Sequence, residues 1–156
     1  MKVHETGHDK ANDRVTTHPP VELHSPGGVI TLESHGRLRV LVADDIRDDV
    51  FFLMRTLRQR GHETLFADTP SAAKQLMMTG GVDVVISDLR MPVLAMGHEV
   101  MMHAIEAGIR TIAHTGTPDE IDPDLAVRLH AVIEKTADRA KLATRLTEAL
   151  RPSQQE

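Results

Sequence analysis

The chain has 156 residues, no cysteine and a formal net charge of -5 at pH 7. Its acidic balance and an aromatic content of 2% argue against a nucleic-acid-binding surface, and the absence of cysteine excludes disulfides and thiolate metal sites. The length suits a single domain. The sequence contains no apolar run of membrane-spanning length and no signal-peptide segment at its start. We therefore expect a cytoplasmic protein that contacts neither membrane nor nucleic acid directly.

Residues 1–36 are rich in Pro, Gly, Thr and His. Large apolar side chains are scarce there, so burial cannot offset the entropy of ordering, and we expect a disordered, His-rich N-terminal tail. The segment His4-Glu5-Thr6-Gly7-His8 matches the H-E-x-x-H pattern of zinc proteases. That pattern requires a packed helix, which Gly7 and the lack of an apolar stripe argue against, so we interpret the match as accidental. The apolar run at 28–32 predicts at most a short edge strand.

Beyond the tail, short apolar runs alternate with helical patterns. The apolar runs predict five strands, at residues 39–43, 62–67, 82–87, 109–113 and 131–133. The helical patterns predict five helices, at residues 49–60, 70–79 and 99–107, a short one from about 124, and one at 138–150. We expect Asp48 to cap the first of these helices.

Strands that alternate with helices in this way predict an α/β fold with a parallel sheet, because each parallel crossover needs a covering helix. A doubly wound five-stranded parallel sheet in the flavodoxin-like order 2-1-3-4-5, with helices on both faces, suits this length. We place the domain at residues 37–151, and a short C-terminal tail at 152–156.

Polar side chains follow the predicted strands at the edge where an open α/β sheet binds its ligands. They are Asp44, Asp45, Asp88, Thr115 and Lys135. Three neighbouring carboxylates repel one another unless a hard cation neutralises them, and oxygen ligands of this kind suit Mg²⁺. With the charge offset, Asp88 can act as a nucleophile toward a phosphoryl group. Taken singly, Thr115 could begin a loop, and Lys135 could pair with a neighbouring carboxylate on the surface.

These residues resemble those of bacterial response-regulator receiver domains of two-component systems, over about residues 38–150. The matching pieces are the acidic pair after Val40-Leu41-Val42-Ala43, the segment Asp88-Leu89-Arg90-Met91-Pro92, Thr115 and Lys135. The resemblance implies that Asp88 accepts a phosphoryl group from the phosphohistidine of a sensor histidine kinase, with Thr115 as switch hydroxyl. It also implies a Mg²⁺ ion held by Asp45, Asp88 and the backbone carbonyl of Arg90, and through water by Asp44.

Three positions depart from the family pattern. Gly97 comes one residue later than the usual glycine after Pro92, so the intervening loop should carry one extra residue. Val132 stands where the family places an aromatic switch residue, so the usual readout of phosphorylation should be altered. Thr136 replaces the proline that follows the lysine in the family, which removes the reason for a cis peptide bond there.

The short segment after the last predicted helix favours a stand-alone receiver that signals through a protein partner. That partner could be a histidine phosphotransferase or another downstream protein. An alternative keeps the receiver fold as a phosphorylation-independent adaptor with an altered output face. A third class is a small enzyme on the same sheet, but Arg90 occupies the position where an aspartyl phosphatase carries its general acid, and the Asp44-Asp45 pair would repel a flavin phosphate. We therefore expect a signalling domain whose only catalysis is its own phosphorylation and dephosphorylation.

Overall fold

The computed structural model describes residues 23–25, 28–30 and 36–152. The chain divides into two units, Met1–His35 and Gly36–Glu156. In the first unit, β1 (Leu23–Ser25) and β2 (Gly28–Ile30) pair antiparallel as a separate two-stranded sheet. The prediction of a disordered tail at 1–36 falls mostly on residues outside the described part of the chain, as does the H-E-x-x-H segment.

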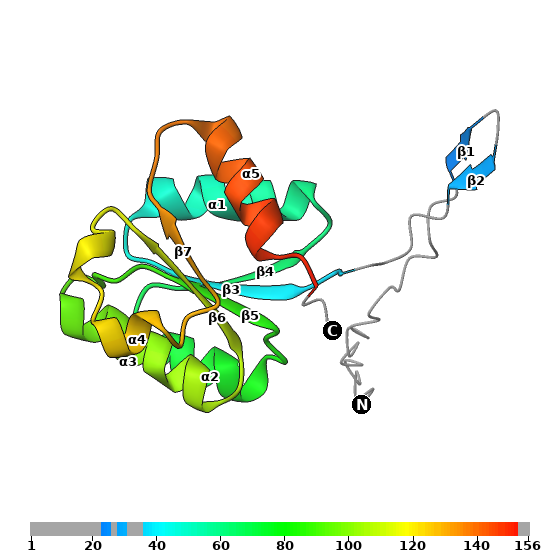
Figure 1. Cartoon of the computed structure of the whole chain (residues 1–156). Coiled ribbons are helices and arrows are strands. Elements are labelled where there is room, and N and C mark those ends of the chain that lie inside the picture. Colours follow the sequence, from blue (N-terminus) through cyan, green and yellow to red (C-terminus); the bar gives the residue numbers. More distant parts are fainter. Residues whose placement is uncertain (1–22, 26–27, 31–35, 153–156) are drawn as a thin grey trace, which may run out of the picture. The chain divides into compact units, whose positions relative to one another are not determined.

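The second unit is built on a five-stranded parallel sheet (Figure 1). Its strands are β3 (Arg39–Ala43), β4 (Glu63–Ala67), β5 (Val84–Ser87), β6 (Arg110–Thr115) and β7 (Ala131–Glu134). They lie in the order β4-β3-β5-β6-β7, and every neighbouring pair is parallel. When these five strands are numbered 1 to 5 in chain order, their order in the sheet is 2-1-3-4-5, so the predicted flavodoxin-like topology is confirmed.

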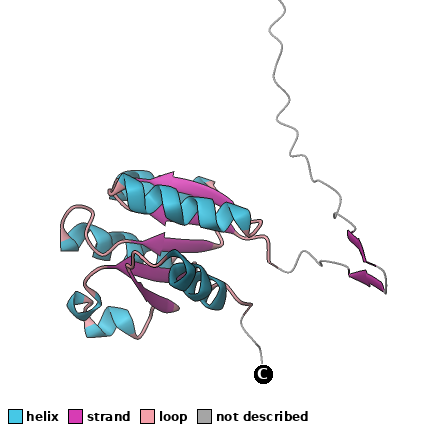
Figure 2. Ribbon diagram, turned by 90° about the horizontal axis from the view of Figure 1, so that it is seen from above, coloured by secondary structure: helices cyan, strands magenta, loops and turns pink. Residues whose placement is uncertain are grey.

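The helices cover both faces of the sheet, as Figures 1 and 2 show. They are α1 (Arg47–Gln59), α2 (Pro70–Thr79), α3 (Leu94–Glu106), the 3₁₀ turn η1 (Pro118–Glu120), α4 (Pro123–Ala126) and α5 (Arg139–Ala149). Alternate strand residues point to opposite faces. Val42 and Ile86 therefore pack with α1 and α5, whereas Leu41 and Val85 pack with α2 and α3.

A third apolar cluster fixes the segment between β6 and β7. Ile121 and Leu125 from the η1–α4 region pack there against Leu89, Met101 and Ala113. Complete burial of such aliphatic side chains stabilises the fold by roughly 1.5–3 kcal/mol each. The two prolines of this region predict a short α4. Ile121 and Leu125 are the buried side chains that hold it to the sheet.

Two helices begin earlier than the sequence predicts. α1 starts at Arg47 with Ile46 as its N-cap, so the prediction that Asp48 caps a helix from residue 49 is wrong. Asp48 instead lies within the first helical turn, where its charge still favours the positive end of the helix dipole. α3 starts at Leu94, not at residue 99, because the segment around Gly97, which the sequence predicts as a loop, is helical.

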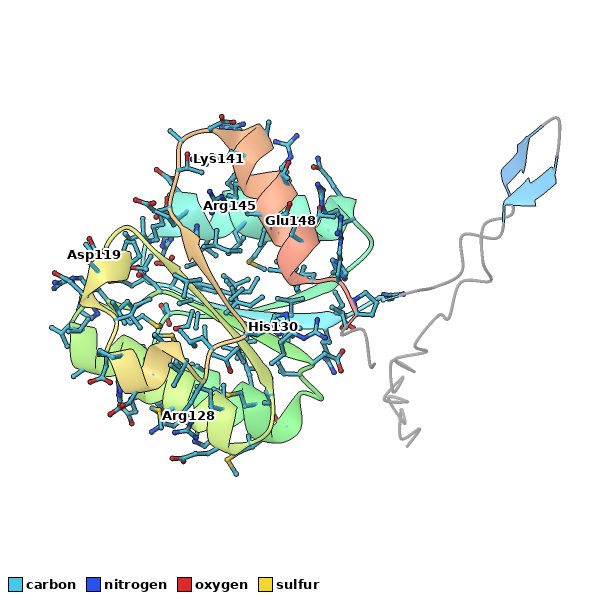
Figure 3. The ribbon with its side chains drawn as sticks, viewed as in Figure 1. Asp119, Arg128, His130, Lys141, Arg145 and Glu148 are labelled. Carbon is cyan, nitrogen blue, oxygen red and sulfur yellow. The ribbon has the colours of Figure 1, made fainter. Side chains whose placement is uncertain are left out.

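The outer side of α5 is charged, with Lys141, Arg145 and Glu148 exposed (Figure 3). Its inner side contributes Leu142 and Leu146 to the core.

Within the described residues, no helix has the length and apolar character needed to cross a bilayer.

Gly97 is buried in α3 where the helix passes close to the backbone of the β5–α3 loop. A Cβ at this position would collide with the carbonyl groups of Leu89 and Asp88. The late position of this glycine, which predicted one extra residue in the preceding loop, thus marks a close contact between α3 and the backbone of Asp88 and Leu89.

We predict that Gly97→Ala lowers the free energy of unfolding by about 2–3 kcal/mol or more, because the backbone of Asp88 and Leu89 must move to admit a methyl group. Urea unfolding followed by circular dichroism measures the change. Gly116→Ala is the matched control, since nothing lies within 4 Å of a Cβ built there. Equal stabilities of the two variants would show that the close contact is not a constraint.

Candidate functional site

The ends of the central strands bring the predicted site residues to one edge of the sheet. Asp88 follows β5, and its backbone N–H donates to the carbonyl of Ala43 at 2.9 Å. Lys135 follows β7, and its N–H donates to the carbonyl of Thr115, also at 2.9 Å. These bonds extend the parallel ladders by one residue past each strand. They fix the Asp88 and Lys135 side chains beside the acidic pair that follows β3.

Asp44, Asp45 and Asp88 form an acidic cluster in which one oxygen from each carboxylate lies within 4.8 Å of the others. Asp44 and Asp88 are almost fully buried, whereas Asp45 is exposed. Burial, partly opposed by the hydrogen bond from the Ile46 N–H and by Lys135, raises the pKa of Asp44 to about 6. Acidic oxygens gathered in this way are a suitable ligand set for a hard divalent cation.

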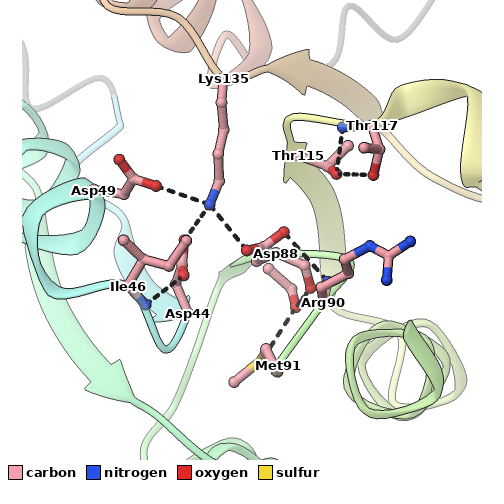
Figure 4. Close-up of polar contacts among 10 residues, drawn as sticks. Asp44, Ile46, Asp49, Asp88, Arg90, Met91, Thr115, Thr117 and Lys135 are labelled. Carbon is pink, nitrogen blue, oxygen red and sulfur yellow. Dashed lines mark hydrogen bonds and ion pairs between the residues drawn. The ribbon is translucent and has the colours of Figure 1, made fainter. Parts of the chain in front are cut away.

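The ammonium group of Lys135 balances part of this negative charge (Figure 4). Its Nζ lies 2.9 Å from Asp88 Oδ2, 2.9 Å from Asp49 Oδ2 and 3.2 Å from Asp44 Oδ2. Burial alone would lower the pKa of Lys135, but the hydrogen bonds to Asp49 and Asp88 and the charge of Asp44 outweigh it and raise that pKa. Lys135 therefore stays charged and faces the site, not a surface partner at Glu134 or Asp138.

Thr115 and Arg90 lie on the other side of Asp88. The Thr115 hydroxyl accepts a hydrogen bond from the Thr117 N–H at 3.1 Å and lies 3.3 Å from the Thr117 hydroxyl. The Arg90 N–H donates to Asp88 Oδ1 at 3.3 Å, and the Arg90 guanidinium extends away from that carboxylate (Figure 4). The Arg90 Nε donates instead to Glu120 on η1. Within the described residues, the cis peptide bond is Met91–Pro92, and the bond between Lys135 and Thr136 is trans.

His114 is a buried polar residue next to the site that the sequence did not single out. It lies on β6 with 4% of its surface exposed, and neither ring nitrogen has a hydrogen-bond partner within the described residues. Burial, followed by the positive charge of Lys135, lowers the pKa of His114 to about 4, although Asp49 and Asp88 oppose the shift. The imidazole is therefore neutral at pH 7.

Five of the predicted side chains thus gather at one edge of the sheet, together with the backbone of Arg90. Asp49 was missed, because it is only the first residue of a predicted helix in the sequence; in the structure it binds Lys135 from the first turn of α1. Glu120 was missed as well, since its partner Arg90 is distant in sequence and only the fold brings them together. His114 was detectable in principle, because it occupies a buried strand directly before Thr115.

Comparison with known proteins agrees with this arrangement. A family model described as the response regulator receiver domain matches residues 40–147, which is more than half of the chain. A search of curated proteins found no match. The fold and the family model together show that the chain belongs to the response regulator receiver domain family. Receiver domains are signalling domains of two-component systems and not conventional enzymes.

Solved structures with the same fold share limited sequence identity with the chain. The response regulator protein TrrA of Thermotoga maritima, in complex with Mg²⁺–BeF, is 23% identical with a TM-score of 0.63; the match covers 72% of this chain and 99% of that one. The receiver domain of an HD domain-containing protein of Pseudomonas fluorescens is 24% identical with a TM-score of 0.60, covering 73% and 94%. A CheY-like receiver domain of Methylobacillus flagellatus is 18% identical with a TM-score of 0.59, covering 72% and 98%.

The buried His114 predicts a pH dependence of stability. Its unfolded pKa is 6.5 and its folded pKa about 4, so between these values the unfolded state binds more protons and stability falls as the pH falls. The loss between pH 7 and pH 4 is on the order of 3 kcal/mol. Asp44 acts in the opposite sense, because its folded pKa of about 6 lies above its unfolded value of 3.8.

Comparison of the wild type with His114→Phe isolates the histidine, since both proteins retain Asp44. We predict that urea unfolding at several pH values shows the wild type losing stability relative to the variant as the pH falls from 7 toward 4. The charged groups facing His114, which are Lys135, Asp49 and Asp88, are present in both. Parallel stability curves for the two proteins would contradict the prediction.

Proposed function

We propose that the chain accepts a phosphoryl group on Asp88 from the phosphohistidine of a sensor histidine kinase. The observation that carries this proposal is the Asp88 carboxylate, buried at the end of β5 with one oxygen bound to Lys135 and the other beside the Arg90 N–H. Asp88 Oδ forms a bond to phosphorus as the P–N bond of the donor breaks. The electron pair of that bond returns to the donor imidazole.

The acidic cluster fits a Mg²⁺ ion. Two of its three carboxylates are buried close together. Burial makes the charged form of Asp44 unfavourable and so raises its pKa, and a bound cation would offset that cost. We propose that Asp45, Asp88 and the Arg90 carbonyl hold the ion, with Asp44 acting through water. When bound, Mg²⁺ neutralises charge on the transferring phosphoryl oxygens.

We further propose that Lys135 and Thr115 bind the other phosphoryl oxygens. Lys135 already contacts the Asp88 oxygen, so it needs only a small shift to follow charge from the carboxylate to the phosphoryl group. The Thr115 oxygen accepts from the Thr117 N–H, so its hydroxyl hydrogen can turn from the Thr117 hydroxyl, 3.3 Å away, to a phosphoryl oxygen. The same arrangement supports self-catalysed phosphorylation from a small-molecule donor, and subsequent dephosphorylation by water.

The output of the phosphorylated chain is proposed to pass through a protein partner, either a histidine phosphotransferase or another downstream protein, in the cytoplasm. A cysteine-free chain fits that reducing compartment. The alternative, a phosphorylation-independent adaptor, is favoured by one observation: Val132, at the position of the family's aromatic switch residue, is 38% exposed and too small to act in that way.

We predict that incubation with acetyl phosphate and Mg²⁺ produces a hydroxylamine-labile phosphoryl adduct, detected by intact mass spectrometry. The adduct is absent from Asp88→Asn because the amide is not a nucleophile, and it decreases strongly in Asp45→Asn or with excess chelator. Asp68→Asn is the matched control, because Asp68 is an exposed carboxylate that directly follows β4, the strand beside β3. No adduct on the wild type, or an equal adduct on Asp88→Asn, would overturn the proposal.

Beryllofluoride, which mimics the phosphoryl group, separates the switch from the adaptor. A switch changes the amide spectrum of the surface around β7 and α4 when beryllofluoride and Mg²⁺ are added. If the chain is an adaptor, the amide spectrum of that surface stays the same, whether or not the mimic binds.

A further inference from the structure

Arg90 and Glu120 form an ion pair that links the candidate site to the η1–α4 segment. The Arg90 Nε donates to Glu120 Oε2 at 3.1 Å, and Nη2 contacts the same oxygen. The Arg90 guanidinium, followed by the Thr117 hydroxyl, holds the pKa of Glu120 below its usual range. Glu120 is therefore an anion at neutral pH and holds the guanidinium on the η1 side of the site.

This pair completes a chain of contacts from Asp88 to Thr115. Asp88 Oδ1 accepts from the Arg90 N–H, and the Arg90 side chain binds Glu120. The Glu120 N–H donates to the Thr117 carbonyl at 3.0 Å, and the Thr117 N–H donates to the Thr115 hydroxyl. The phosphoacceptor and the switch hydroxyl are thus joined through η1, outside the sheet.

A phosphoryl group on Asp88 would compete with Glu120 for the guanidinium. The phosphoryl group carries a charge of about -1.5 to -2 in place of the single charge of the carboxylate, and it has three acceptor oxygens, whereas Glu120 offers a single carboxylate. Arginine binds phosphate oxygens strongly and often through two parallel hydrogen bonds. Both side chains of the existing pair are more than a third exposed, so the pair is screened by solvent and weak enough to be replaced.

We propose that Glu120 is a positioning residue: it holds the Arg90 guanidinium away from Asp88 in the unphosphorylated chain, and a phosphoryl group on Asp88 draws Arg90 off Glu120 and releases η1 and α4. The proposal rests on the proposed function of Asp88. It gives the chain a route from the site to the surface that does not need an aromatic residue at Val132. The segment can move because η1 and α4 are short, and the buried side chains that hold residues 118–126 to the core are Ile121 and Leu125.

The first test measures the affinity for beryllofluoride in the presence of Mg²⁺ by isothermal titration calorimetry. We predict that Glu120→Gln binds the mimic about 2- to 5-fold more tightly than the wild type, because Arg90 is no longer held by a competing carboxylate. In an Arg90→Ala background, Glu120→Gln has no effect, since the two substitutions act through one contact. Glu120→Asp retains the charge and stays closer to the wild type than Glu120→Gln.

Asp119→Asn is the matched control. Asp119 precedes Glu120 on the same turn and is exposed at the surface (Figure 3), and within the described residues it makes no ion pair with Arg90. Its substitution removes the same charge from the same segment, so unchanged affinity in this variant shows that the effect requires the specific contact. An equal gain in Asp119→Asn would overturn the proposal in favour of a general electrostatic effect.

The second test follows hydrogen exchange at the amides of Glu120 and Ile121, which donate within η1. We predict that the mimic accelerates their exchange in the wild type, and that in Glu120→Gln they already exchange faster without it. If the wild type binds the mimic but shows neither the affinity gain in Glu120→Gln nor the faster exchange, the proposed role of Glu120 is overturned and the proposed function is not. Failure of the wild type to bind the mimic at all would overturn the proposed function and this proposal with it.

Discussion

The site depends on the contact between the Lys135 ammonium group and three carboxylates from separate parts of the chain. Asp44 follows β3, Asp49 belongs to α1 and Asp88 follows β5, yet all three lie within 3.2 Å of Nζ. Without a positive charge at this point, the parallel sheet would hold two buried carboxylates close together with nothing to offset their repulsion. The lysine thus permits the acidic cluster to form without a bound cation.

The fold maintains this arrangement through its backbone. Parallel strands place their carboxyl ends at one edge, and additional ladder bonds carry the order past the strands to Asp88 and Lys135. The helix α3 then passes so close to the β5–α3 loop that only glycine fits at position 97. The side of the site next to β5 is therefore rigid, whereas Thr115 and Arg90 connect to η1, whose anchoring in the core is slight. A group added to Asp88 would therefore displace the weakly anchored η1 side of the site more readily than the β5 side.

The sequence was sufficient to predict the sheet, its strand order and the residues at the strand ends, because those features follow from short apolar runs and the rules of parallel crossovers. Helix starts were predicted less well. Ile46 is the N-cap of α1 without any side-chain hydrogen bond, and no residue type predicts such a cap. The nearby Asp48 was therefore predicted as the N-cap. The contacts of Asp49 and Glu120 could not be predicted, since each depends on a partner far along the chain.

A double-mutant cycle between Lys135 and Asp88 tests the central claim most directly. The free energy of urea unfolding is measured without divalent cations for the wild type, Lys135→Met, Asp88→Asn and the double variant. If Lys135 exists to balance the buried acidic edge, its substitution is less costly once Asp88 is neutral, with a coupling energy of roughly 1–2 kcal/mol. Additive effects of the two substitutions would contradict the account.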